Sequence, residues 1–532
     1  MPANTGTTLL SLPDELLDQI LAEVKWDALE PQFDLDSLGF DQNLTQNTAD
    51  IQAVRLTCRR LAWRASPLLL PVASVAISDP SSIDSLEQIA RHAALAPYVK
   101  AVRVRFDVYD AGLAADIRAL AAYLCDAWLG SDLLWEAKWT RTFEHWRTFS
   151  LGAAPAGNGW DPVPDDVRNE WEASIQELER QHREYQRRYQ AQYRLRPVVL
   201  GRIAAAMAAI PNATRLALTD GPDTPHKASH AARGAGAPWL VAPMNWENIL
   251  RRCDYAPPIW MLLSLPVVVH RAGVSLTALR IHRIRIPARF PRRPSPDCDW
   301  DALALTRNQT TLPRALLDAC ASLRVLDFAT HYEPKPGCVS AQADWSRVMK
   351  GSGPPARWDH VLEAMQIRSR QLVQLRVDFQ TLHGVATYQG DSMLRPSFTW
   401  PLIRVLHLRD GPVEITNLRD LLASTVKTLV QLSLDGMSLY AGPVASTVPQ
   451  TPYSWSLVLD HLRAHCCKHG LVAWVRAPRG AEFDDRSVRG RKHLLALFAP
   501  DGAGTSDVDR YVGGLADRNP IVEAGLTRRL YL

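Results

Sequence analysis

A chain of 532 residues in which 47% are hydrophobic and 22% are charged has the composition of a globular protein. It is long enough for several domains or one extended repeat array. Its 60 basic and 56 acidic residues give a formal net charge of +4, too small to predict a general nucleic-acid-binding or membrane-binding surface. The longest apolar run, from Pro257 to Val269, is too short and too interrupted by proline to cross a bilayer.

The first residues lack the basic and apolar regions of a secretory signal, so we expect the protein in the cytoplasm, the nucleus or both. The sequence contains eight cysteines and no CxxC pair, a pattern that in an intracellular protein favours buried thiols over disulfides.

An amphipathic helix is predicted near the N-terminus. Ser11 can cap it, Pro13 is tolerated in its first turn, and Asp14 suits the positive end of the helix dipole. Its apolar residues recur at helical spacing: Leu12, Leu16, Leu17, Ile20, Leu21 and Val24.

A polar, acidic segment from Asp27 to Asp50 has no sustained periodicity and predicts a long surface loop. A second helix is then predicted, which Pro67 terminates. Its stripe of small and apolar residues comprises Ile51, Val54, Cys58, Leu61 and Ala65.

The strings LPDELLDQIL and IQAVRLTCRRLAWRASPLLL resemble the two ends of an F-box. This resemblance implies that the helices dock a Skp-type adaptor, and through it the cullin scaffold of a ubiquitin ligase. The alternative is a pair of ordinary amphipathic core helices. The residues that the resemblance assigns to adaptor binding are Leu12, Pro13, Leu16, Leu17, Ile20, Leu21, Leu56, Cys58 and Leu61.

Residues 74–107 predict a strand, a helix and a second strand. Similar strands are expected near residues 214, 275, 322, 371, 401 and 428, where aliphatic residues have the Leu-x-x-Leu-x-Leu spacing of a leucine-rich repeat. Helical stretches precede several of them, including LPRALLDACA, HVLEAMQIRS and LRDLLAS. Six recurrences favour an irregular solenoid, and the alternative is a generic α/β protein.

A long, exposed helix is predicted over residues 162–196, and insertions rich in Gly, Pro and Ser predict loops. The body, including SWSLVLDHL and DRYVGGLADRNP, resembles the large family of F-box proteins of filamentous fungi. We therefore predict an α/β protein. Its parts are an F-box-like helical module (1–75), first strand and helix units (76–127), a helical insertion (128–200) and an irregular leucine-rich-repeat-like solenoid with a C-terminal cap (201–532).

Common nucleotide-binding and hydrolase motifs are absent from the sequence, so we expect no catalytic residues and no cofactor. The densest group of possible metal ligands is HLRAHCCKH at 461–469, but a second pair of ligands is missing, so no metal site is predicted. Asp484 and Asp485, next to several arginines, are interpreted as a charged surface turn.

The leading hypothesis is a non-enzymatic adaptor whose solenoid binds a target protein, with no nucleic-acid or membrane partner. Two alternatives remain. One is a ligase-independent scaffold in which the N-terminal helices cap the solenoid. The other is an enzyme or metalloprotein that uses the histidines and cysteines near His465.

Overall fold

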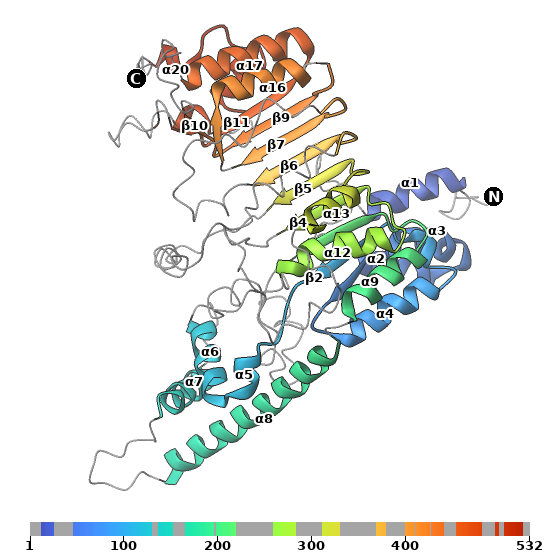
Figure 1. The fold of residues 1–532 in the computed structure, drawn as a ribbon, viewed down its shortest axis with the longest axis vertical. Coiled ribbons are helices and arrows are strands. Elements are labelled where there is room, and N and C mark those ends of the chain that lie inside the picture. Colours follow the sequence, from blue (N-terminus) through green and yellow to red (C-terminus); the bar gives the residue numbers. More distant parts are fainter. Residues whose placement is uncertain are drawn as a thin grey trace, which may run out of the picture.

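The computed structural model describes residues 12–25, 46–129, 137–152, 165–195, 198–219, 259–282, 311–329, 369–378, 400–409, 411–425, 427–440, 454–480, 483, 495–499 and 505–524. These residues form a mixed α/β fold around a nine-stranded parallel sheet (Figure 1). Each strand of the sheet pairs with the next one along the chain. The strands are β1 (Val72–Ala76), β2 (Ala101–Arg105), β3 (Arg215–Thr219), β4 (Ala278–His282), β5 (Val325–Ala329), β6 (Gln374–Asp378), β7 (Val405–Arg409), β9 (Gln431–Asp435) and β11 (Val472–Arg476).

The core side of the sheet repeats one pattern. In β5, Leu326 and Phe328 alternate with residues that face the opposite side of the sheet, and Leu323 is buried just before the strand. The equivalent triplets before and within other strands are also buried: Val99, Val102 and Val104; Leu276, Leu279 and Ile281; Leu372, Leu375 and Val377; Ile403, Leu406 and Leu408; and Leu429, Leu432 and Leu434. The six strands predicted from aliphatic spacing are therefore confirmed as neighbours in one sheet. β11 was not predicted.

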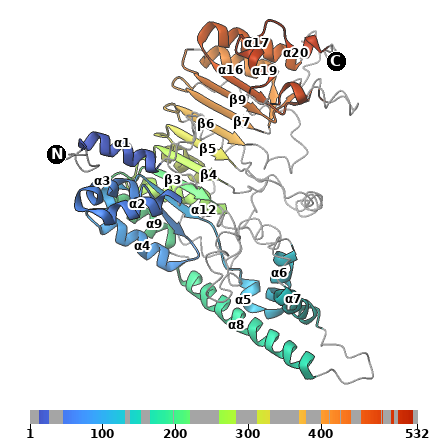
Figure 2. The ribbon, with the colours of Figure 1, turned by 180° about the vertical axis from the view of Figure 1, so that it is seen from behind.

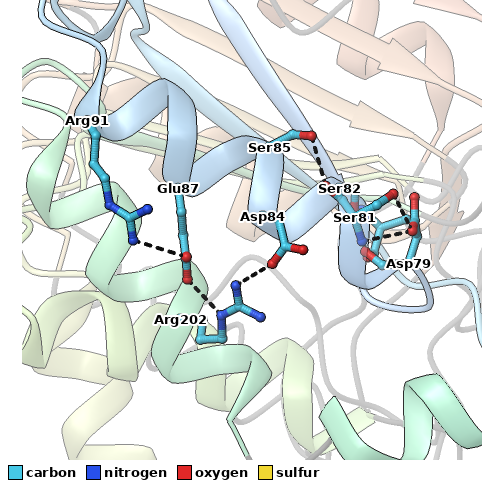
Figure 3. A network of polar contacts seen from close by, with 9 residues as sticks. Asp79, Ser81, Ser82, Asp84, Ser85, Glu87, Arg91 and Arg202 are labelled. Carbon is cyan, nitrogen blue, oxygen red and sulfur yellow. Dashed lines mark hydrogen bonds and ion pairs between the residues drawn. The ribbon is translucent and has the colours of Figure 1, made fainter.

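Helices α4 (Pro80–Arg91), α9 (Val199–Ala209), α12 (Ile259–Arg271) and α13 (Thr311–Ala319) pack side by side on one face of the sheet (Figure 1). Polar contacts join the first two. Arg202 of α9 lies between Asp84 and Glu87 of α4, at 2.7 Å from an oxygen of each (Figure 3). This network lowers the pKa of Glu87, chiefly through the hydrogen bond from Arg202. These ion pairs hold α4 and α9 together at the surface of the helix layer.

At the C-terminal end of the sheet, a second small parallel sheet contains β8 (Pro412–Glu414), β10 (Ser438–Tyr440) and β12 (Arg479–Gly480). Each of these strands follows a long strand within a few residues. Helices α16 (Ile415–Thr425), α17 (Trp455–His469), α19 (Asp507–Val512) and α20 (Pro520–Glu523) pack here. Gly470 ends α17 with φ of 70°, a left-handed conformation that favours glycine.

A helical projection extends from the body and contains α5 (Ala111–Ala115), α6 (Ile117–Leu129), α7 (Ala137–Ser150) and α8 (Asp165–Leu195) (Figure 2). This confirms the long helix predicted over 162–196. Gln192 joins α8 to the end of β2: its amide oxygen accepts from Tyr109 N at 2.8 Å, and its amide nitrogen donates to Tyr109 O at 3.1 Å. These two bonds give hydrogen-bond partners to buried backbone groups.

The N-terminal module contains three helices where the sequence predicted two: α1 (Asp14–Lys25), α2 (Gln46–Thr57) and α3 (Arg59–Leu69). The predicted second helix was wrong in two respects. Cys58 is extended, with φ of −161°, and its sulfur accepts a hydrogen bond from Leu61 N, so the helix breaks and restarts there. Pro67 does not end α3, which continues to Leu69.

The predicted loop from Asp27 to Asp50 was also wrong at its end, because α2 already begins at Gln46. The rest of that loop lies outside the described residues. So do most of the Gly-, Pro- and Ser-rich insertions, the HVLEAMQIR part of the helix expected before β6, and Asp484 and Asp485. In the described part, no helix is both long enough and apolar enough to cross a membrane.

Candidate functional site

The three-helix module has a core of its own. Leu21, Ile51 and Ala65, one residue from each helix, form a cluster separate from the core of the large sheet. Leu17 of α1 and Leu61 of α3 are also buried. Since Leu17 and Leu21 lie one helical turn apart, one stripe of α1 is used to hold the module together.

Ion pairs fix the start of α1 against α3. Arg60 lies 2.6 Å from the Asp14 carboxylate and donates to the Leu12 carbonyl at 2.8 Å. Arg64 pairs with Asp14 and, at 3.0 Å, with Asp18. Arg60 and Arg64 thus form ion pairs inside the module.

A second apolar stripe of α1 faces outward. Leu16 and Ile20 are 44% and 38% exposed, and they lie one turn apart on a face rotated from that of Leu17. Leu56, in the last turn of α2, is 88% exposed, and Trp63 of α3 is 63% exposed. Each of the three helices thus exposes at least one large apolar side chain.

The nine residues predicted for adaptor binding divide by burial. Leu17, Leu21 and Leu61 are buried, Leu12 and Cys58 are half-buried, and the exposed ones are Pro13, Leu16, Ile20 and Leu56. Sequence reasoning did not single out Trp63, an exposed aromatic residue of α3. Its ring is covered on one side by the Arg64 guanidinium at 4.6 Å, and its place outside the apolar stripe of the helix is the signal that could have found it.

On the sheet face opposite α4, α9, α12 and α13, a buried polar row runs across the strands. Arg280 and Asp327, on neighbouring strands, form an ion pair with Nε and Oδ2 3.0 Å apart. Burial raises the pKa of Asp327, while Arg280 and Arg376 act to lower it. His407 is next in the row, and one of its ring nitrogens lies 3.1 Å from the Gln431 side chain, within hydrogen-bonding distance. Burial, and to a lesser extent the positive charge of Arg376, lowers the pKa of His407 to about 4. His407 is therefore neutral at physiological pH.

The histidines and cysteines near His465 lie on the second half of α17. The rings of His465 and His469 are 5.8 Å apart, and burial raises the pKa of the Cys466 thiol to about 11, which disfavours the thiolate needed to bind a metal. Among the residues that the structure describes, no group of three or more metal-ligating side chains comes together.

Searches against models of known protein families, curated proteins and solved structures found no match to this chain.

Proposed function

We propose that this protein is a substrate-recognition adaptor of a Skp-cullin-F-box ubiquitin ligase. Helices α1 to α3 would bind the Skp-type adaptor, the body would bind a target protein, and catalysis would belong to the partner enzymes. The observation that carries the proposal is the outward apolar stripe of Leu16 and Ile20, together with exposed Leu56, on a module whose own core is already filled.

We further infer that the body is an irregular leucine-rich-repeat-like solenoid. Two features support this. Consecutive strands pair in chain order with parallel register, and the triplet of buried residues recurs with Leu-x-x-Leu-x-Leu spacing before and within successive strands. At the C-terminal end, units built on β7 and β9 each add a short second strand and a helix in the same order.

A ligase-independent scaffold is the second candidate, with α1 to α3 serving only as a cap. The burial of Leu17 removes one predicted docking residue from the surface, and a cap does not need Leu17 to be accessible. The two functions differ in what Leu16 and Ile20 contact: an adaptor in the first case and water in the second.

The test is co-expression of the full chain with a Skp-type adaptor, followed by co-purification. Wild-type protein should retain the adaptor, and a Leu16→Asp, Ile20→Asp double variant should lose it, since charges would enter an apolar interface. The matched control is Leu515→Asp, Val522→Asp, which changes two exposed aliphatics of the C-terminal cap. Wild-type protein that fails to bind, or a double variant that binds as well as wild type, would refute this docking surface.

A further inference from the structure

The edge of the sheet where the strands begin carries a row of cations. The turns that enter β2, β5, β6, β7 and β9 each place one exposed basic residue there: Lys100, Arg324, Arg370, Arg404 and Lys427. In Figure 1 this edge is on the right, opposite the arrowheads of the strands. The last four come from neighbouring strands, and we call them the basic edge.

Hydrogen bonds keep this edge in register beyond the strands themselves. Val373 N donates to Arg324 O at 2.7 Å, Arg404 N donates to Val373 O at 2.7 Å, and Val430 N donates to Arg404 O at 2.8 Å. Arg324 and Arg404 lie directly before their strands, at equivalent positions two strands apart, and Arg370 and Lys427 lie at equivalent positions three residues earlier on the other two strands. Neighbouring strands of a sheet are about 4.8 Å apart, so the two cations of each pair start from backbone positions about 10 Å apart. A rigid scaffold therefore sets the spacing of these charges.

The four side chains of the basic edge have no ion pair or side-chain hydrogen bond with any residue that the structure describes. The described turn residues before β2 to β11 contain no Asp or Glu. The carboxylates closest to Arg324 in sequence are Asp327, which is buried on β5 and paired with Arg280, and Asp318, in the last turn of α13. The helix dipole explains basic residues in final helical turns, such as Arg271 and Lys468. It does not explain Arg324 or Arg404, which directly precede strands.

Two aliphatic side chains lie among these charges. Leu402, in the turn before β7, is 50% exposed, and Val430, directly before β9, is 39% exposed. Trp400, the aromatic residue of the same turn as Leu402, is buried. The edge thus combines cations with aliphatic contacts and, in its described part, offers no exposed aromatic ring from these turns.

We propose that the basic edge binds an extended, acidic segment of a partner protein, with aliphatic side chains of that segment against Leu402 and Val430. Charge complementarity identifies the acidic partner. Two short rows of cations that cross neighbouring strands fit a linear chain better than the plane of a membrane. Single-stranded nucleic acid usually needs stacking aromatics, which the described turns do not expose. The inference concerns a different surface from α1 to α3 and does not depend on the ligase role.

The test uses the full chain and a fluorescein-labelled peptide of glutamates with interspersed leucines, followed by fluorescence anisotropy. The edge variant is Arg324→Glu, Arg370→Glu, Arg404→Glu. Its matched control is Arg147→Glu, Arg194→Glu, Arg419→Glu, which changes net charge equally at exposed arginines of α7, α8 and α16. We expect the edge variant to bind at least about tenfold more weakly than wild type and the control to stay within about twofold. Raising the salt concentration should weaken wild-type binding.

A Leu402→Ser, Val430→Ser double variant should bind the leucine-containing peptide more weakly than wild type does. It should bind a peptide that contains only glutamates as tightly as wild type does. Several outcomes would overturn the inference. These are no peptide binding by wild type, equal binding by the edge variant, an equal loss in the control, or tighter binding of wild type to an unlabelled DNA oligonucleotide or to vesicles of anionic lipid. None of them bears on adaptor co-purification, so failure here and failure of the proposed function are distinguishable.

Discussion

Asp327 and Arg280 bring two opposite charges into the interior of the molecule, on the sheet face opposite the helix layer. Both side chains are buried, and the Asp327 carboxylate also faces the charge of Arg376 on the next strand. Removing charges from water is expensive, and their attraction offsets that cost only while both are present. The pair therefore adds little stability over an apolar pair, but loss of either charge alone is costly.

Asp327→Ala should therefore destabilise the sheet by about 3–5 kcal/mol, because the Arg280 charge stays buried without this carboxylate. A double variant, Arg280→Met, Asp327→Leu, should recover most of the loss, since an apolar pair carries no desolvation cost. Urea denaturation followed by tryptophan fluorescence measures both. Equal instability of the single and double variants would contradict this account.

Residue periodicity could identify the apolar residues of the candidate site but not their roles. The stripe on α1 contains two adjacent pairs, Leu16 with Ile20 and Leu17 with Leu21, each spaced by one helical turn. Which pair fills the module and which faces outward depends on where α2 and α3 lie. That placement comes from Ile51, Ala65 and the ion pairs of Asp14, all distant in sequence.

At the scale of elements, α8 shows how a long exposed helix is stabilised. Glu184 accepts hydrogen bonds from Arg187 and Arg188, at 2.7 Å from each, and these contacts lower its pKa to about 2. A carboxylate with a lowered pKa contributes stability above its unfolded pKa, and this contribution is lost as the pH falls toward its folded pKa. The window for Glu184 thus extends from about pH 4.5 down to about pH 2.

Glu184→Gln should destabilise the helical projection by about 1 kcal/mol at neutral pH, a value discounted for solvent screening. The difference from wild type should narrow as the pH is lowered through that window. Urea midpoints from far-UV circular dichroism, measured wherever the protein remains folded, test this. Glu179→Gln is the control, because Glu179 is half exposed and its contact with Arg183 is long, at 3.9 Å. A pH-independent difference would count against the ion-pair explanation.

The strands were predictable one by one because aliphatic residues alternate within them, as in Leu406 and Leu408 or Leu432 and Leu434. β11 was harder to find, since alanine occupies the position equivalent to Leu432 and weakens the pattern. The break at Cys58 was not predictable from periodicity. The apolar stripe continues from Val54 through Leu61, and only the extended backbone of Cys58 divides it.

At the scale of the whole molecule, the separate cores of the N-terminal module and the sheet predict separate responses to mutation. The large sheet and its helices share one continuous cluster of buried residues, whereas Leu21, Ile51 and Ala65 form a small cluster by themselves. A core this small provides little stability, so the module should unfold before the sheet does.

Ile51→Ala removes buried methyl groups from that small core, and a loss of about 2–5 kcal/mol is enough to unfold the module. Hydrogen exchange measured by mass spectrometry should then show faster exchange in α1, α2 and α3 and unchanged protection in β4 to β9. Leu432→Ala is the control in the large core, where one cavity should affect neighbouring strands and leave the module protected. If Ile51→Ala also removed protection from the sheet, the module would be an integral cap of the body. That result would favour the scaffold over the adaptor, because a cap and the body it covers unfold together.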